Sequence, residues 1–586
     1  MNPISFENVA IRRGFWAERI RTVSEKTAWA CIEECERTHR IDNFRRAGGL
    51  QPGGFEGIFF NDSDVYKVLE GVAYVLMQER SPALEAKADE IIDAICAAQQ
   101  PDGYLYTFYT LNTPEYRWTD MNKHEAYCLG HMVEGAIAYA RATGKEKWLN
   151  AARRAVAQMM SVNGPEGQHW VTGHEELELA LVKLYRYTGD WRYVEYAKWL
   201  VEERGHGHLK TPHSPDVGSF KPEYFQDDVP VREIRRVVGH AVRAMYYYSG
   251  VTDLAALLHD EEYEAVMTRV WGNVVPANLY LTGGIGQTAS NEGFSSEWSL
   301  PNLTAYCETC AAIGMALWNH RMNLMHGESK YADIVELEMY NGILSGISLE
   351  GDRFFYENPL ASAGQHHRRR WFGCSCCPTN LIRFVPSVGG YMYAVDAQTL
   401  YVNQFIDSKT QIPLGERQIG IDMATDYPWD GLVRLQFSGF EGECAIRLRR
   451  PGWCDNASLA LNGTPVERLE NGYYSLSVKA GDALEYRMEM LPRRVYADER
   501  IREDAGRVAV MRGPLVYCAE EADNPGIPTE YFHAELALPR DAALTCAPAP
   551  ELPGVVSVLG GGVTLVPYYA WDNRAPGAMV VWMKQT

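Results

Sequence analysis

The most restrictive feature of this sequence is the way in which its helical segments are connected. Between about residues 15 and 394, twelve stretches show the apolar spacing of amphipathic helices. Four connections between them are short and contain a glycine, which tolerates the left-handed backbone conformation that ends a helix. These are Thr143-Gly144-Lys145, Thr188-Gly189-Asp190, Ser249-Gly250-Val251 and His326-Gly327-Glu328. Each is expected to join two neighbouring helices as a helical hairpin.

The connections between these hairpins are much longer and are rich in glycine, histidine and aromatic residues. They span 41–62, 100–124, 161–174, 205–236, 276–306 and 348–377. Short turns at one end and long loops at the other predict six helix pairs in a ring, an (α/α)6 barrel, with a pocket on the long-loop face. An open helical solenoid is the alternative, but the spacing is irregular and shows no repeat consensus.

After about residue 395 the apolar pattern changes to the period of two that is typical of strands. Strand-like segments lie at 400–405, 433–437, 444–448 and 508–511. The sequence therefore predicts an α+β multidomain protein, with the barrel over 1–395 and one or two β-sandwich domains over 396–586. The β half is interpreted as a packing partner of the barrel, and a carbohydrate-binding module is the alternative.

Composition excludes several classes of function. The 586-residue chain has a formal net charge of −20, which argues against binding to nucleic acid or to an anionic membrane. It has no apolar run long enough to cross a bilayer, and its N-terminus lacks the apolar core of a secretory signal. Thirteen cysteines without an export signal predict a cytoplasmic protein with metal-binding or catalytic thiols instead of disulfides.

Two short motifs each place sulfur and carboxylate groups at the start of a predicted helix. The first is Cys374-Ser375-Cys376-Cys377, which precedes a proline suited to the first helical turn. The second is Cys307-Glu308-Thr309-Cys310, in which the threonine is a good N-cap. Helix N-termini favour anions such as thiolates and carboxylates. Two such sites in one chain predict a metal ion bound between them.

Soft sulfur ligands in a reduced compartment select zinc, and ferredoxin-type iron–sulfur clusters use wider cysteine spacing. Cys307 and Cys374 are rival ligands that spacing alone does not exclude. Four protein ligands ordinarily make a structural zinc site, so catalysis would require that a ligand is itself the nucleophile. The favoured ligand set comprises Glu308, Cys310, Cys376 and Cys377.

Other candidate residues follow the long loops. A glycine-rich run precedes Glu292 and Glu297, and either glutamate is a candidate general acid. No βαβ unit surrounds these glycines, so they do not form a dinucleotide-binding fingerprint. Three histidines fall near the starts of helices, at the loop-rich mouth, where a substrate-binding role stands beside a purely structural one. They are His124, His174 and His240.

At these motifs the chain resembles glycoside hydrolase family 127, whose type activity is that of a β-L-arabinofuranosidase. The resemblance covers nearly the whole chain. One departure lies around the acid, where this chain reads Asn291-Glu292-Gly293-Phe294 and the family pattern is glycine, glutamate, serine and phenylalanine. The matching motifs include Gly283-Gly284-Ile285-Gly286, Tyr306-Cys307-Glu308-Thr309-Cys310, the runs 355–360 and 374–380, and the run 511–517 in the β half.

The resemblance implies a catalytic (α/α)6 barrel followed by β-sandwich domains, with Zn²⁺ held by the favoured ligand set. It implies that Cys376 is the nucleophile and Glu292 the acid/base of a retaining mechanism. It also implies sugar contacts from Tyr356 and the three histidines. The expected protein is a cytoplasmic, zinc-dependent exo-glycosidase that removes terminal β-L-arabinofuranose, or a related furanose, from short oligosaccharides.

Two alternatives from other classes stay open on the sequence. One is a non-catalytic sugar-binding protein with a structural zinc. The other is a lyase or epimerase on the same ring of helices, with His124 or His240 as the base. The sequence leaves the oligomeric state open, and a homodimer is compatible with it.

Overall fold

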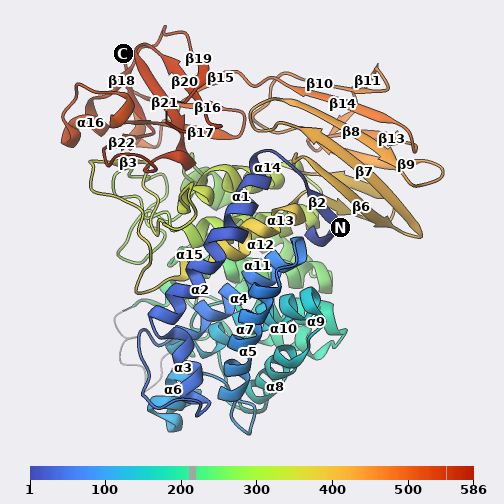
Figure 1. The fold of residues 1–586 in the computed structure, drawn as a ribbon, viewed down its shortest axis with the longest axis vertical. Helices are drawn as coiled ribbons and strands as arrows, with labels where there is room; N and C mark the ends of the chain where they lie inside the picture. The colour runs from blue at the N-terminus through green and yellow to red at the C-terminus, as the bar shows by residue number, and fades with distance from the viewer. Residues whose placement is uncertain (210–219, 550) are drawn as a thin grey trace.

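The structure, a computed structural model, describes residues 1–209, 220–549 and 551–586. A helical part extends from α1 (Phe15–Thr22) to the 3₁₀ segment η10 (Val385–Tyr391), and sheets follow it (Figure 1). This is the α+β order predicted from the sequence. Among the helices of the described ranges, none combines the length and the apolar character that crossing a membrane requires.

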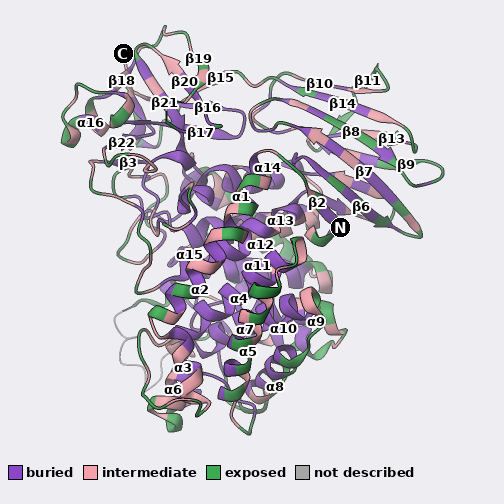
Figure 2. Ribbon diagram, in the orientation of Figure 1, coloured by how far each residue is buried: buried purple, intermediate pink, exposed green. Residues whose placement is uncertain are grey.

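Six helices form a closed inner ring, in which each packs against the next and the last packs back against the first. In ring order they are α4 (Asp62–Gln78), α7 (Glu125–Thr143), α9 (Leu177–Thr188), α11 (Ala241–Leu258), α13 (Thr309–His326) and α15 (Cys376–Phe384). The first turns and middles of α7 and α11 are buried on almost every side, as Figure 2 shows. Ring neighbours, outer helices and the filled centre of the ring surround them.

Six further helices cover the ring from outside. They are α2 (Ala28–Arg37), α5 (Pro82–Ala98), α8 (Lys147–Val162), α10 (Arg192–Glu203), α12 (Glu261–Asn278) and α14 (Ser329–Leu337). Each packs on an inner helix, and α2 contacts both α4 and α15, so that an early helix covers the last one. Outer helices bury one face, as an amphipathic pattern requires. The contacts between these helices are consistent with the predicted (α/α)6 arrangement.

One predicted turn is wrong. Three of the four glycine turns end helices as expected, with left-handed residues at Gly144, Gly189 and Gly327. Ser249-Gly250-Val251 instead lies in the middle of α11. An added Cβ at Gly250 would lie 3.0 Å from the Cβ of Glu178 on α9. This glycine therefore permits close packing of two inner helices and does not end one.

Two of the expected long loops contain short helices. α3 (Arg40–Ala47) lies at the start of the first, and α6 (Thr107–Asn112) lies in the second. Each is too short to show a complete apolar period, so the pattern did not reveal them. The loop expected over 205–236 is only partly described, because 210–219 lie outside the described residues.

The first β domain is a sandwich of two sheets. One has the strand order β1 (Asn2–Pro3), β4 (Tyr393–Val395), β5 (Thr399–Val402), β9 (Cys444–Arg449), β13 (Tyr473–Val478) and β12 (Leu469–Glu470). The other has the order β11 (Thr464–Pro465), β10 (Ala457–Leu461), β14 (Ala483–Met488), β8 (Leu432–Ser438), β7 (Arg417–Thr425), β6 (Ser408–Leu414) and β2 (Val9–Ile11). The rings of Tyr474 on β13 and Tyr486 on β14 lie 5.9 Å apart, so the sheets pack face to face.

Strands β1 and β2 show that the chain's first residues belong to this sandwich. β1 pairs with β4 and β2 pairs with β6, both antiparallel, so residues that precede the barrel in the sequence extend the sheets that follow it. Strands of two and three residues are too short for a period-two pattern, which is why the sequence did not predict them. The pairing places the N-terminal segment beside the barrel end that faces the sandwich (Figure 1).

The C-terminal part is a ten-stranded sheet with one helix, α16 (Thr529–Glu535). Its main path is β18 (Ala537–Leu538), β23 (Met583–Gln585), β16 (Arg507–Arg512), β17 (Leu515–Glu520), β21 (Val563–Pro567), β20 (Val556–Gly560) and β19 (Thr545–Pro548), flanked by β15 (Pro492–Val495), β22 (Met579–Val580) and β3 (Ala361–Ser362). β3 belongs to a long loop of the barrel and pairs with β22. The C-terminal sheet therefore holds a loop that approaches the barrel mouth.

The approach of α4 to α15 depends on Gly71. An added Cβ at Gly71 would lie 2.7 Å from the main-chain oxygen of Ile382 on α15. We expect Gly71→Ala to force the two helices apart and to lower the free energy of unfolding by about 1–3 kcal/mol, measured by urea denaturation. The matched control is Gly272→Ala on α12, where no atom lies within 4 Å of an added Cβ. Equal stability of the two variants would contradict this account.

Candidate active site

The starts of α13 and α15 meet at the long-loop end of the barrel and bring the two cysteine motifs together. Glu308 is the N-cap of α13, so the prediction that Thr309 has this place is wrong. Thr309 instead begins the helix, and its hydroxyl donates a hydrogen bond to the carbonyl oxygen of Phe355 at 2.9 Å. α15 begins at Cys376, directly after its N-cap Ser375.

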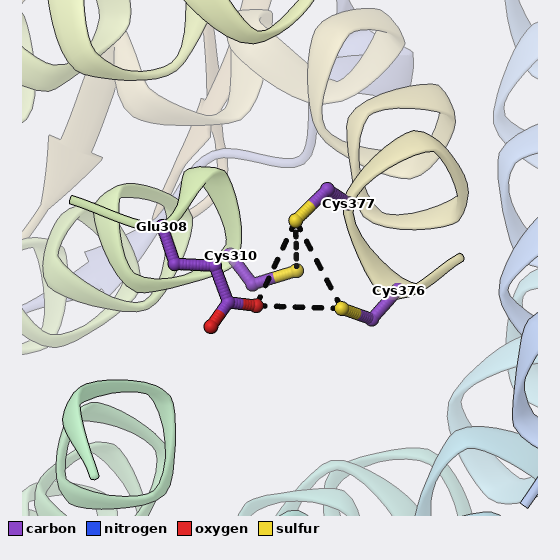
Figure 3. Close-up of side chains that lie close together, drawn as sticks. All are labelled: Glu308, Cys310, Cys376 and Cys377. Carbon is purple, nitrogen blue, oxygen red and sulfur yellow. Dashed lines mark hydrogen bonds between the residues drawn. The ribbon is translucent and has the colours of Figure 1, made fainter. Parts of the chain in front are cut away.

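Four buried side chains converge between these helix starts (Figure 3). Their ligand atoms all lie within 4.8 Å of one another, and the group can hold a metal ion. The Sγ of Cys376 lies 3.3 Å from Oε1 of Glu308, and the Sγ atoms of Cys310 and Cys377 are 3.5 Å apart. The four residues are those favoured from the sequence: Glu308, Cys310, Cys376 and Cys377.

The donor set fits a cation with a preference for sulfur. Burial and the neighbouring Cys376 raise the pKa of Glu308 well above its ordinary value, and burial does the same to the pKa of Cys377. Oε2 of Glu308 is buried and has no hydrogen-bond partner in the described part of the chain. A divalent ion would satisfy this oxygen and stabilise the ionised thiols, which otherwise repel one another.

The two rival cysteines lie outside this cluster. The Sγ of Cys374 lies 3.7 Å from that of Cys376 and 3.7 Å from the Tyr356 hydroxyl, and its half-buried side chain lines the pocket described next. Cys307 is completely enclosed on the other side of the loop, where an added Cβ at Gly284 would lie 2.8 Å from its sulfur. The spacing of the cysteines in the sequence did not show that Cys307 and Cys374 lie outside the cluster.

A pocket of about 270 Å³ opens over the cluster. Glu308, Cys310 and Cys376 line it, so three cluster members are accessible from the pocket, with Cys376 the most exposed of the four at 9%. The hydroxyl of Tyr356 lies 3.2 Å from the Sγ of Cys376 and can donate a hydrogen bond to a thiolate. Tyr356 is therefore placed beside the sulfur as well as beside the space that a ligand would fill.

Glu292 stands on another wall of the same pocket. Its Oε2 accepts a hydrogen bond from the Tyr306 hydroxyl at 3.1 Å and lies 3.4 Å from Nε2 of His240. Burial would raise the pKa of Glu292, but these contacts and the charge of Arg243 outweigh burial and lower the pKa to about 2. Glu297, the other candidate acid, is exposed outside this pocket and accepts a hydrogen bond from Asn273 at 2.8 Å.

The three predicted histidines lie next to one another along the pocket. The ring centroids of His124 and His174 are 5.5 Å apart, and those of His174 and His240 are 5.7 Å apart. Nδ1 of His124 and of His174 each donates to a main-chain carbonyl oxygen, at 2.6 and 2.9 Å, which leaves Nε2 as an acceptor. Nδ1 of His240 instead accepts a main-chain N–H at 3.4 Å, which leaves its Nε2 as a donor. Burial lowers all three pKa values, so neutral rings face the pocket.

Arg243 lines the pocket, although the sequence did not single it out. Its side chain is buried, and its guanidinium lies 4.9 Å from the ring centroid of Tyr224 and 5.1 Å from that of Phe225. Nε and Nη1 have no hydrogen-bond partner among the described residues. Arg243 follows His240 by three positions, so the two residues share one helix face. This spacing is the sequence signal that could have identified Arg243.

The C-terminal sheet supports the loop that carries Tyr356. The ring of Phe355 stacks on that of Trp571 with centroids 4.8 Å apart. The guanidinium of Arg368 lies 4.2 Å from the ring centroid of Phe355 and donates to the carbonyl oxygens of Ser345 and Trp571. The observed contacts of the β half with the barrel are thus packing contacts behind the pocket.

A helical ring with a pocket of single-sugar size, lined by neutral imidazoles, aromatic rings and a carboxylate, is suited to binding a carbohydrate. Comparison of the sequence with known protein families identifies the class of enzyme. The family described as "Beta-L-arabinofuranosidase, GH127 catalytic domain" matches residues 8–390, and the middle and C-terminal domains of the same family match 399–490 and 492–584. The chain belongs to glycoside hydrolase family 127 and is a glycoside hydrolase.

Individual relatives extend over the same length. A curated non-reducing end beta-L-arabinofuranosidase of Bifidobacterium longum subsp. longum is 38% identical, over 94% of this chain and 93% of the relative. The crystal structure of a beta-L-arabinofuranosidase from Geobacillus stearothermophilus T6 is similar with a TM-score of 0.94 and 38% identity, over 99% of this chain and all of that one. A further beta-arabinofuranosidase structure of this family has a TM-score of 0.93 and 38% identity, over 100% and 98% of the two chains.

The loop before α15 is held by a buried ion pair. Nε of Arg40 lies 2.9 Å from Oδ2 of Asp64, and its Nη2 donates to the carbonyl oxygen of Gly373 at 2.8 Å. Arg40→Ala would remove the hydrogen-bonded partner of the buried Asp64 and leave only the longer contact with Lys67 at 3.7 Å, so we expect the free energy of unfolding to fall by about 1–3 kcal/mol in urea denaturation. Arg37→Ala is the matched control, because the Arg37 side chain is 64% exposed. A loss no larger than that of the control would show that this pair does not hold the loop.

Proposed function

We propose that this glycoside hydrolase is a zinc-dependent, retaining exo-glycosidase that releases terminal β-L-arabinofuranose from oligosaccharides or glycoconjugates. The relatives at 38% identity, named as arabinofuranosidases, support this sugar. The observation that carries the proposal is the position of Cys376. Its sulfur belongs to the buried cluster and also lines the pocket that contains Glu292.

The size of the pocket supports action on a chain end. A volume of about 270 Å³ is at the lower limit for a ligand pocket and suits a single sugar ring. The neutral rings of His124 and His174 offer acceptors and that of His240 a donor, so a furanose can exchange hydrogen bonds in both directions. The remainder of the substrate must extend out of the pocket, which makes the terminal residue the one removed.

In the first half of the reaction the Sγ of Cys376 attacks the anomeric carbon while the bond from that carbon to the leaving oxygen breaks. Glu292 gives its proton to that oxygen. Without a ligand the Glu292 side chain is 38% exposed and its pKa is low, so it is a carboxylate. A bound sugar covers the side chain and raises this pKa by desolvation, which favours the protonated form that the step requires.

In the second half a water molecule attacks the same carbon and gives a proton to Glu292. The bond between carbon and sulfur breaks, and Cys376 returns to the thiolate form. Each half inverts the anomeric centre, so the configuration is retained overall. The hydroxyl of Tyr356, 3.2 Å from the sulfur, can stabilise the departing thiolate by donating a hydrogen bond.

The residues that would hold zinc are Glu308, Cys310, Cys376 and Cys377. When bound, the ion keeps the thiols deprotonated near neutral pH, so that Cys376 is available as a thiolate. Its three sulfur ligands require a reducing environment, which supports the cytoplasm as the location.

Metal analysis tests the cluster directly. We expect the purified chain to carry about one zinc ion per molecule, the stoichiometry of a single four-ligand site, measured by plasma mass spectrometry. Cys377→Ser should lose the ion, because Cys377 belongs to the cluster. Cys546→Ser is the control, because Cys546 is exposed and far along the chain in the C-terminal sheet. Full activity of a preparation without metal would reject the zinc requirement.

Substitution of the two reacting groups tests the mechanism. We expect Cys376→Ser and Glu292→Gln each to reduce release of L-arabinose from an aryl β-L-arabinofuranoside by at least about 10³-fold. With a good leaving group, Glu292→Gln should also accumulate a pentosyl adduct on Cys376, detected by mass spectrometry of the intact chain. Each reacting group loses its assigned role if its variant keeps wild-type turnover. Release of a different pentose from a panel of aryl furanosides would correct the sugar.

A further inference from the structure

A second hollow lies on the other side of Glu292. It has a volume of about 500 Å³, almost twice that of the pocket over the cysteines. Asn291 and Phe294, which flank Glu292 in the chain, belong to its wall, and Tyr224 lines both spaces. This hollow, called the outer groove here, is therefore separated from the pocket by the loop that carries the proposed acid/base.

Main-chain hydrogen bonds hold the walls of the outer groove to one another. The N–H of Phe294 donates to the carbonyl oxygen of Gly239 at 2.8 Å, and the N–H of His240 donates to that of Tyr224 at 3.3 Å. An added Cβ at Gly239 would lie 1.8 Å from the main-chain oxygen of Glu223, and one at Gly293 would lie 1.9 Å from that of Gly239. These contacts leave no room for side chains, so three segments of the chain form one rigid structure.

The chemistry of the outer groove suits a sugar. Its lining offers donors from Lys221 and Arg236, and side chains that both donate and accept from Asn291, Ser295 and neighbouring hydroxyl residues. Phe220, Tyr224 and Phe294 add aromatic rings next to these polar groups. A surface with many hydrogen-bonding groups and several aromatic rings matches a ligand that carries many hydroxyl groups and apolar ring faces.

The position of Glu292 decides which part of a substrate enters the outer groove. A general acid gives its proton to the oxygen of the bond that breaks, so the leaving group lies on its side of the cleaved bond. Cys376 and the three histidines lie in the pocket, where the sugar that is removed must bind. The part of the substrate beyond Glu292 is therefore the leaving group.

We propose that the outer groove binds the leaving group, and that the preferred substrate is an oligosaccharide with about two sugar residues beyond the cleaved bond. This inference rests on the proposed function and adds to it the length of the substrate. Binding energy from residues remote from the reacting atoms increases kcat/KM when it is used to hold the transition state. Arg236 and Lys221 are the specificity-determining residues in this account.

The experiment compares two substrates that release the same sugar. One is methyl β-L-arabinofuranoside, whose leaving group does not reach the outer groove, and the other is a linear trisaccharide that ends in β-L-arabinofuranose. For the wild type we expect kcat/KM for the trisaccharide to exceed that for the methyl glycoside by about tenfold or more. Arg236→Ala and Lys221→Ala should each lower this ratio by about three- to tenfold.

Arg235→Ala is the matched control, because Arg235 is an exposed neighbour of Arg236 and does not line the outer groove. It should leave the ratio at the wild-type value. A wild-type ratio near one, or a ratio unchanged in both groove variants, would overturn the inference and leave the proposed function intact. Failure of the wild type to release arabinose from either substrate would instead overturn the proposed function. Both variants alter exposed side chains, and measurement of their melting temperatures against the wild type would check that they are folded.

Discussion

The packing of α15 against both α13 and α4 is the constraint on which the rest of this structure depends. Contact with α4 closes the ring of inner helices, and contact with α13 brings two helix starts face to face. Four ionisable side chains then converge in a largely buried space beneath the pocket. Such a cluster favours a bound cation, because burial and nearby negative charge raise the pKa values of Glu308 and Cys377 and so oppose their ionisation. The same helix, α15, therefore takes part both in the closure of the barrel and in the formation of the cluster.

The pocket above the cluster is organised by neutral polar groups. Three buried imidazoles have their tautomers set by main-chain partners, and Arg243 supplies a permanent charge whose Nε and Nη1 have no partner among the described residues. This charge disfavours protonation of the histidines and favours the carboxylate form of Glu292. In the proposed mechanism, a bound substrate would cover Glu292 and so favour its protonated form. Residues of the same loop line both the pocket and the outer groove, so in the proposed mechanism one short segment would carry the acid and lie between the two parts of a substrate.

The β domains support the barrel on the side away from the pocket. The C-terminal sheet pairs with the barrel strand β3 and stacks Trp571 on Phe355, next to Tyr356. The sandwich takes two strands from the start of the chain, which ties the N-terminal segment to residues that follow the barrel. Among the described residues of the β domains, none lines the pocket over the cluster. The β domains contribute to the site by holding the long loops that carry the side chains of the pocket.

By itself the sequence determined the features that depend on neighbouring residues. These features are the apolar period, the glycines at Gly144, Gly189 and Gly327, and the composition of the two cysteine motifs. Each depends on only a few consecutive positions, so helices, their ends and the types of ligand atom could be predicted from the sequence. Only the tertiary structure decided which groups meet. It placed Cys310 beside Cys377 but left Cys307 outside the cluster, put Glu292 in the pocket and Glu297 outside it, and used Gly250 for helix contact. Those outcomes depend on the packing of segments distant in the chain, which a local pattern does not contain.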